Sequence, residues 1–402
     1  MKHLLATAFA LFLLAASLPL CAQQRLAGKV VDAATGQPVP YASLGVLGTT
    51  RGTTSNAEGE FELHEVALPG RLVVSELGHR RDTVAVAAAG ASQPLQIRLQ
   101  AASVQLPEVQ VGSYLGELVA KAYRELRRTN SQHTYGQTFY RQVTHLDQEA
   151  TEVQEMVWET ETSNAGLEGS ALAQARFAKK KALISFTNFS LYTKRYSLFN
   201  SRDDSSTFKG LIGPHVTDYL TLKLLGITQD GNQQLVKIGF SNKHETATDF
   251  THGSMVINEA THQVLRLRLE TSGLHTKSNN PLFKFKNEVT RIEWAFQPSA
   301  HGAAKLAYLK VDYQTALGRV MKPDMAIHVA SFASCYNGQA SPAASVTYAP
   351  AKNGEADLAA IKQTTYDPAF WRDNPVVKRT PLEDNIMRAF EQKGAFGTML
   401  TP

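Results

Sequence analysis

Short apolar runs separated by glycine, proline and asparagine fill residues 26–99. The runs are too short for most helices, and turn-forming residues between such runs are typical of an antiparallel β-sandwich. A polar hairpin is expected over Gly52–Gly59. Strands are predicted at Gly28–Asp32, Pro40–Val46, Glu60–Leu63, Arg71–Leu77, Asp82–Val86 and Leu95–Leu99.

A helical stripe follows at residues 115–128. Its apolar positions recur three or four residues apart, at Leu115, Leu118, Val119, Ala122 and Leu126. This spacing predicts one amphipathic helix. Arg124, Arg127 and Arg128 lie off the stripe, which indicates a solvated face more than a partner site.

Alternation of apolar and polar residues dominates the chain beyond Asn130. In Leu265–Glu270 three leucines face one side, and two arginines and a glutamate face the other, as in a half-buried strand. The patch Ser163–Ala175, rich in Gly, Ala and Ser, is predicted to be a loop or weak helix. Strands are predicted at Tyr135–Val143, Thr151–Thr162, Leu235–Phe240, Gly253–Asn258, Gln263–Thr271, Asn287–Phe296, Leu306–Gln314 and Ala326–Phe332.

The tail predicts a second helix with well-defined ends. Thr380 is a good N-cap, Pro381 fits the first helical position, and Glu383 completes a capping box. Gly394 is the natural stop. Burial of Phe370 and Trp371 just before this helix should be worth several kcal/mol, so we expect the tail to dock on the sheet.

These patterns predict a mainly β chain: an N-terminal sandwich, then a larger curved antiparallel sheet domain with flanking helices. The length of 402 residues also indicates more than one domain. The predicted divisions are a signal peptide at 1–22, the sandwich at 23–100, a linker at 101–112 containing a strand near Pro107–Val111, and the β-rich domain at 113–402.

The N-terminal stretch resembles the carboxypeptidase regulatory-like domain, a transthyretin-like sandwich of Bacteroidetes-type envelope proteins. The resemblance implies an accessory module, not a catalytic one. The region from 113 to 402 resembles the uncharacterised C-terminal regions found beside this sandwich, and by fold analogy the half-barrels of periplasmic lipoprotein carriers. The residues that carry the first resemblance are Gly28, Val30, Asp32, Gly36, Pro38, Pro40, Ala42, Gly52, Thr53, Asn56, Gly59, Phe61 and Gly78.

The first residues predict export. Lys2 and His3 precede an uncharged apolar run, Leu4–Leu20, which is short for a membrane span. Leu20 disfavours lipidation of Cys21 without excluding it. We therefore expect a periplasmic protein, or one at the periplasmic face of the outer membrane, with no transmembrane helix in the mature chain. Cleavage would leave one cysteine and no intramolecular disulfide.

The formal charge is +5 and the pI about 9.0. Predicted export excludes nucleic acid as the natural partner, so the candidates are an envelope protein, a lipid or a glycan. A basic excess suits anionic headgroups or polysaccharide, although solubility alone would also explain it.

The sequence offers no catalytic, cofactor-binding or metal-binding residues. No His-x-x-Glu pair is present, and His252, His262 and His275 are irregularly spaced. Gly239–Lys243 begins like a nucleophile elbow and lacks its last glycine. Cys335, with His328 nearby in sequence, is expected to be an idle thiol.

The hairpin residues Asn56, Glu58 and Gly59 supply too few oxygens for a tight calcium site. Hairpin geometry explains them without a metal.

A non-enzymatic envelope protein for binding or assembly is therefore predicted, without a cofactor. It would hold an apolar ligand in the curved sheet or dock a partner through its β domains. Two alternatives stay open: a zinc-dependent carboxypeptidase-like hydrolase, and an accessory module of a TonB-dependent uptake system. The piece Glu108–Val111 resembles the entry to a transporter plug, but the rest of the chain is too short for a transporter barrel.

Overall fold

The structure is a computed structural model. It describes residues 24–49, 51–87, 93–102, 104–105, 112–199, 210–230, 233–272, 283–350, 356–373 and 377–396. The predicted signal peptide and the predicted strand at Pro107–Val111 lie outside these ranges, as does His275.

The N-terminal region is a two-sheet sandwich, as predicted. Alternate residues of its strands form one core with Phe61, Leu72 and Ile97 fully or almost fully buried. One pair differs from the antiparallel expectation, because β1 and β7 run parallel. One sheet has the order β4 (Glu60–Val66), β1 (Gln24–Asp32), β7 (Leu95–Leu99), and the other β3 (Gly52–Thr54), β2 (Ser43–Val46), β5 (Gly70–Ser75), β6 (Asp82–Val86).

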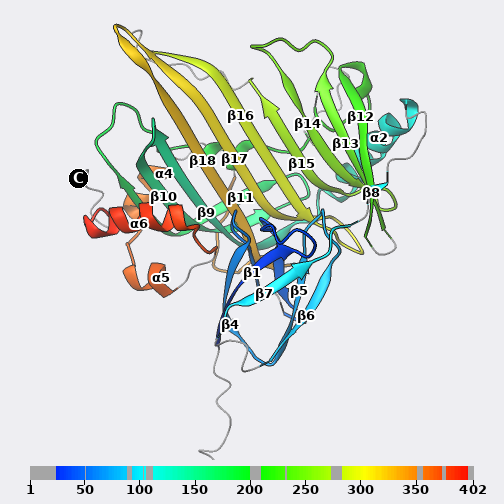
Figure 1. The fold of residues 1–402 in the computed structure, drawn as a ribbon, viewed down its shortest axis with the longest axis horizontal. Coiled ribbons are helices and arrows are strands. Elements are labelled where there is room, and N and C mark those ends of the chain that lie inside the picture. The colour runs from blue at the N-terminus through cyan, green and yellow to red at the C-terminus, as the bar shows by residue number, and fades with distance from the viewer. Residues whose placement is uncertain are drawn as a thin grey trace, which may run out of the picture.

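A third sheet, with 12 strands, dominates the molecule, and all its described pairings are antiparallel (Figure 1). The eight strands predicted beyond Asn130 are confirmed, most of them longer than expected. The sheet order is β19 (Ala349–Pro350), β11 (Leu167–Lys179), β10 (Glu149–Thr162), β9 (Thr134–Leu146), β18 (Lys322–Gln339), β17 (Lys305–Arg319), β16 (Phe283–Gln297), β15 (Val264–Thr271), β14 (Thr251–Asn258), β13 (Gln233–Asn242), β12 (Leu220–Asp230), β8 (Val104–Gln105).

The loop or weak helix predicted at Ser163–Ala175 is wrong. Most of that patch belongs to β11, which pairs with β10 along its length. Small residues hide the alternation in the sequence, but they fit here because α4 (Asp357–Gln363) packs closely on this strand. Tertiary packing overrides a weak local preference at this position.

Strand β12 was not predicted. Its leucines alternate up to Leu224, and then the pairing with β13 shifts between Leu224 and Gly226. A bulge inserts one residue and moves the later side chains to the other face. A period-two pattern therefore breaks in the middle of the strand.

One face of the large sheet, the α2 face, carries the largest apolar cluster. The predicted helix is confirmed as α2 (Gly112–Thr129), and its stripe packs against buried residues of β12–β18. The helix α3 (Ser190–Arg195), the 3-10 helix η2 (Val216–Asp218) and α4 also lie against the sheet.

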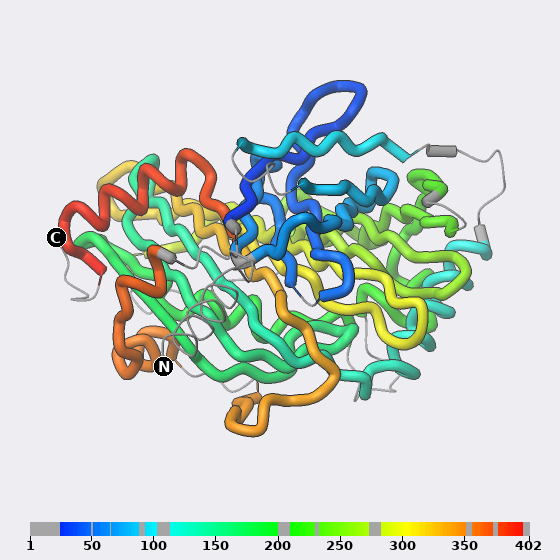
Figure 2. The backbone as a smooth tube through the Cα atoms, turned by 90° about the horizontal axis from the view of Figure 1, so that it is seen from below, coloured from blue at the N-terminus to red at the C-terminus, as the bar shows by residue number. Residues whose placement is uncertain are grey.

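The opposite face, the sandwich face, holds the sandwich and the tail side by side (Figure 2). The tail contains α5 (Pro368–Asp373) and α6 (Pro381–Gln392), and the capping box at Thr380 and Glu383 is confirmed. Trp371 and Phe390 are buried against β9–β11, so the predicted docking is also confirmed. Among the described helices, none is both long enough and apolar enough to cross a bilayer.

Candidate functional site

An aromatic cluster fixes the sandwich to the large sheet. Tyr41 lies in the turn before β2 and adopts a left-handed conformation (φ 57°). Its ring centroid lies 5.6 Å from that of Tyr308 and 5.3 Å from that of Phe332, and Lys310 Nζ lies 4.0 Å from the Tyr41 centroid. Such contacts add about 1 kcal/mol each beyond area burial.

A buried arginine makes the second link. Arg266 of β15 donates to Glu76 of the sandwich at 2.9 Å and lies 3.3 Å from Glu293 of β16. Burial would raise the pKa of Glu76, but a hydrogen bond from His79 and the charge of Arg266 outweigh it and lower the pKa to about 2. The sandwich is therefore held by a specific ionic contact as well as by packing.

A second buried ionic group holds the tail. Glu155 of β10 lies between Arg141 of β9 and Arg176 of β11, at 2.7 Å and 2.5 Å, and all three side chains are almost fully buried. Burial would raise the pKa of Glu155, but the charges of Arg176 and Arg141 lower it to about 2. One carboxylate thus faces two guanidiniums.

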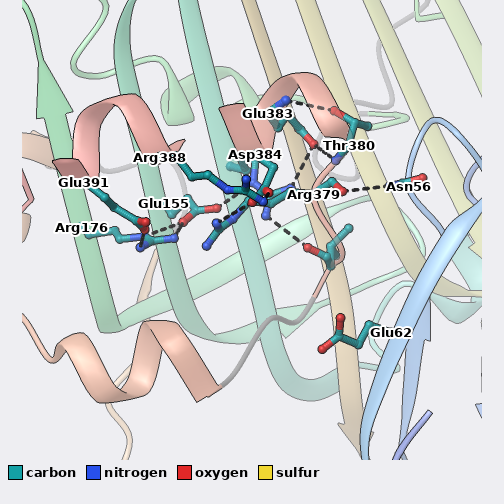
Figure 3. Close-up of polar contacts among 12 residues, drawn as sticks. Asn56, Glu62, Glu155, Arg176, Arg379, Thr380, Glu383, Asp384, Arg388 and Glu391 are labelled. Atoms are coloured by element: carbon teal, nitrogen blue, oxygen red, sulfur yellow. Dashed lines mark hydrogen bonds and ion pairs between the residues drawn. The ribbon is translucent and has the colours of Figure 1, made fainter. Parts of the chain in front are cut away.

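Helix α6 supplies the missing negative charge (Figure 3). Glu383 lies 3.4 Å from Arg141, and Glu391 lies 3.2 Å from Arg176. The Arg176 guanidinium also lies over the rings of Trp371 and Phe396, at 4.7 Å and 4.8 Å. Both arginines are buried, so removal of Glu383 or Glu391 would leave buried positive charge less well compensated, and these contacts help to hold the tail on the sheet.

A cavity of about 870 Å³ lies between the sandwich and the tail. We call it the charged cleft. Its cationic side chains are Arg25, Arg176, Arg372, Lys378, Arg379 and Arg388, and its carboxylates are Glu60, Glu62, Asp384 and Glu391.

Two contacts join the walls of the charged cleft. Lys378 Nζ lies 3.2 Å from Glu60, and Asn56 Nδ2 donates to the Arg379 carbonyl oxygen at 3.2 Å. The Asn56 Oδ1 atom accepts from the backbone N–H groups of Glu58 and Glu60. Asn56, weighed above as a calcium ligand, thus orders its hairpin and ties it to the tail.

Glu62 lies on the sandwich wall of the charged cleft. It accepts a hydrogen bond from Arg25 at 2.6 Å and lies 2.5 Å from His64 Nε2. Burial would raise the pKa of Glu62, but the hydrogen bonds from His64 and Arg25 hold it below its usual value. Glu62 is therefore ionised at neutral pH and places a negative charge on this wall.

Asp384 lies on the tail wall of the charged cleft. Arg379 donates to its Oδ1 atom at 3.2 Å, and Arg388 pairs with its Oδ2 atom. Two guanidiniums thus share one carboxylate, and Arg388 is 65 % exposed. The tail wall therefore carries an excess of hydrogen-bond donors and positive charge.

Cys335 lies beside a different cavity, of about 290 Å³, between β2–β3 and the strands β9, β17 and β18. Burial raises the pKa of this thiol to about 11, and Thr138 donates to its Sγ atom at 3.4 Å. Cys335 is therefore protonated at neutral pH, which disfavours a nucleophilic role.

The histidines that the structure describes do not form one cluster. His328 pairs with Asp312 at 2.5 Å and stacks on His145, whereas His252 lies near Glu245 in another part of the sheet. In the described ranges, no three His, Cys, Asp or Glu side chains are placed to hold a metal ion. Ser241 of the incomplete nucleophile-elbow pattern lies in β13, paired with β12 and β14.

Sequence reasoning missed the charged cleft and the ionic group behind it. The signal was present: Arg141 falls on the same strand face as Phe139 and Val143, which are apolar. A charge on an apolar face needs a buried partner. Nothing in the sequence pairs that arginine with Glu155 or with the tail.

A family model for the CarboxypepD_reg-like domain matches residues 26–111, which confirms the expected N-terminal domain. No curated protein matches the chain.

The solved structures that match the chain include the following two. A LolA superfamily protein from Nitrosomonas europaea is 10% identical, covers 54% of this chain and 90% of its own, and has a TM-score of 0.18. A DUF1329 family protein from Desulfovibrio piger is 9% identical, covers 56% and 92%, and has a TM-score of 0.23. These TM-scores are too low for either likeness to indicate function.

Proposed function

We propose that the protein is an exported, non-enzymatic binding or assembly component of the cell envelope, and that it holds a polar ligand or partner segment in the charged cleft. The observation that carries this proposal is the joint construction of the cleft by two regions far apart in sequence. The sandwich provides one wall and the tail the other.

The rigidity of both walls supports the proposal. The contacts of Tyr41 and Arg266 fix the sandwich, and the contacts of Glu155 fix the tail. A site built on fixed elements needs little ordering when a ligand binds, and that raises affinity. Its volume is also within the usual range for small-molecule sites, about 300–1,000 Å³.

The apolar-ligand alternative needs room on the α2 face. In the described residues this face is occupied by the chain itself, with Leu118 and Val119 of α2 and Phe199 packed into the cluster. This packing favours the charged cleft over the curved sheet as the binding site.

The hydrolase alternative needs a reactive group. Cys335 is protonated, and no three His, Cys, Asp or Glu side chains of the described residues are placed to hold a metal ion. An accessory role in an uptake system would be one form of the binding function proposed here.

A variant that obstructs the cleft tests the proposal. Asn385 is exposed on α6 and lines the cleft, so Asn385→Trp would place an indole ring at the cleft and obstruct part of it. Leu382 is exposed on the same helix but does not line the cleft, so Leu382→Trp is the matched control. The full chain would be expressed in a Gram-negative host with its N-terminal segment, purified from the envelope and analysed by native mass spectrometry.

We expect a bound molecule or stoichiometric partner on the parent protein and on Leu382→Trp, and its loss from Asn385→Trp. Retention of the same species by Asn385→Trp, or recovery of the parent protein from the cytoplasm, would refute the proposal.

A further inference from the structure

We propose that the charged cleft binds an acidic saccharide, meaning a polyhydroxylated ring that carries a phosphate or carboxylate group. This inference rests on the proposed function, because it names the ligand class for the same cleft.

The tail wall supplies the recognition of the anion. Arg379 and Arg388 share Asp384, so two guanidiniums compete for one carboxylate. Each guanidinium has five N–H donors in a planar fork, which matches a carboxylate or phosphate in bidentate fashion. Unused donors on Arg388, which is largely exposed, can therefore reach an incoming anion without removing a buried group.

The first turn of α6 lies in the same part of the cleft, and Pro381 and Asp384 of this turn line it. The helix dipole adds little positive potential here, because the capping box uses the Glu383 backbone N–H and because Glu383 and Asp384 already place two carboxylates at this end. Recognition of the anion is therefore assigned to the two guanidiniums.

The sandwich wall has the opposite polarity. Glu60 and Glu62 line it, and both accept hydrogen bonds. A simple inorganic anion would be repelled by these carboxylates, whereas ring hydroxyls donate to them. A ligand that spans the cleft therefore needs an anionic group at the tail and hydroxyl donors at the sandwich.

The remaining walls fit a sugar ring. Tyr366 and Pro368 of the tail also line the cleft and contribute apolar surface, and Tyr366 is half-buried. Sugar rings have apolar C–H faces that pack on such surfaces. The cavity of about 870 Å³ also exceeds the size of an inorganic phosphate ion many times over.

Calorimetric titration of the full-length protein tests the inference with four probes: digalacturonate, glucose 1-phosphate, inorganic phosphate and neutral maltose. We expect the two acidic saccharides to bind at least about tenfold more tightly than maltose or inorganic phosphate. Raising the salt from about 0.01 M to about 1 M should weaken binding, because the Debye length falls from about 30 Å to about 3 Å.

Two matched variants locate the anion. Arg388 and Arg128 are each helical, 65 % exposed and paired with one carboxylate of the same helix. Arg388→Gln should weaken binding of glucose 1-phosphate by about tenfold or more, the loss expected for one hydrogen bond to a charged group. Arg128→Gln, on α2, should leave the affinity unchanged.

The outcomes separate this inference from the proposed function. Equal affinity for inorganic phosphate and glucose 1-phosphate, preference for maltose, or indifference to Arg388→Gln would overturn the acidic saccharide. If the envelope-purified protein still carried another species that Asn385→Trp removes, the proposed function would stand. If Asn385→Trp removed nothing, both would fail.

Discussion

Two helices, α2 and α6, cover opposite faces of the same sheet and are held by different forces. Helix α2 buries Leu115, Leu118 and Val119 in the largest apolar cluster, with its basic side chains directed outward. Helix α6 buries Met387 and Phe390 and adds ion pairs to Arg141 and Arg176. An apolar contact has no charge to titrate or screen, whereas an ion pair responds to pH and is screened by salt. The responsive contact is the one beside the charged cleft.

The largest effect is expected from a substitution in the apolar face of α2. Val119 is completely buried, so Val119→Asp would place an uncompensated charge in the main core. We expect a loss of more than about 4 kcal/mol in the free energy of unfolding. Urea unfolding followed by circular dichroism measures it, and an unchanged midpoint would contradict this account of α2.

The next largest effect is expected from a substitution that removes contacts of α6. Arg176→Ala leaves Glu155 with one cation and Glu391 with none. We expect a loss of about 3–5 kcal/mol, as for other buried pairs that lose one partner. Limited proteolysis should then cut the tail before it cuts the sheet.

The control for that variant is Arg128→Ala, which removes an exposed guanidinium from α2. It should leave the unfolding midpoint essentially unchanged, because an exposed ion pair contributes little to stability. Equal effects of the two substitutions would mean that the ionic group does not hold the tail.

The dependence of stability on acidic pH tests the contribution of the ionic group around Glu155. Glu155 has a pKa of about 2 in the folded protein, against an ordinary value of 4.5. A lowered folded pKa stabilises the protein fully above the ordinary value, and this stabilisation disappears as the pH falls toward 2. Unfolding midpoints measured from pH 5 to 2.5 should therefore fall, and the fall should be shallower in Glu155→Gln. Identical slopes would refute the role of Glu155.

The smallest effect concerns the start of α6. Thr380→Ala removes the side-chain oxygen that accepts from the Glu383 backbone N–H at 3.2 Å. We expect a loss of about 1 kcal/mol. Hydrogen exchange should increase in the first turn of α6 and stay unchanged in α2; an increase in α2 would show that the two helices are not independent.

The sequence was sufficient to predict those helices and strands whose local pattern agrees with the final structure. The α2 stripe and the capping box of α6 are local signals, and both predict the observed helices. Strand β11 was not predicted because its small residues show no clear apolar–polar alternation. Strand β12 was not predicted because a bulge after Leu224 interrupts the alternation of its leucines.

The charged cleft could not be predicted from local pattern. It depends on contacts between residues more than 300 positions apart, such as Asn56 with Arg379 and Glu60 with Lys378. Arg141 signalled a buried partner, but only the sheet order shows that Glu155 and the tail provide it.

The neighbouring positions of β9 and β18 have a consequence for how the chain folds. His145 of β9 lies opposite His328 of β18 in the sheet. Strands β9, β10 and β11 therefore join the rest of the large sheet only through β18, which is synthesised near the end of the chain. A polypeptide that emerges N-terminus first, from a ribosome or a translocation channel, can complete the sandwich early. It must keep β9–β11 unpaired on one edge until residues 322–339 arrive, and such long-range closure is slow and exposes strand edges to aggregation.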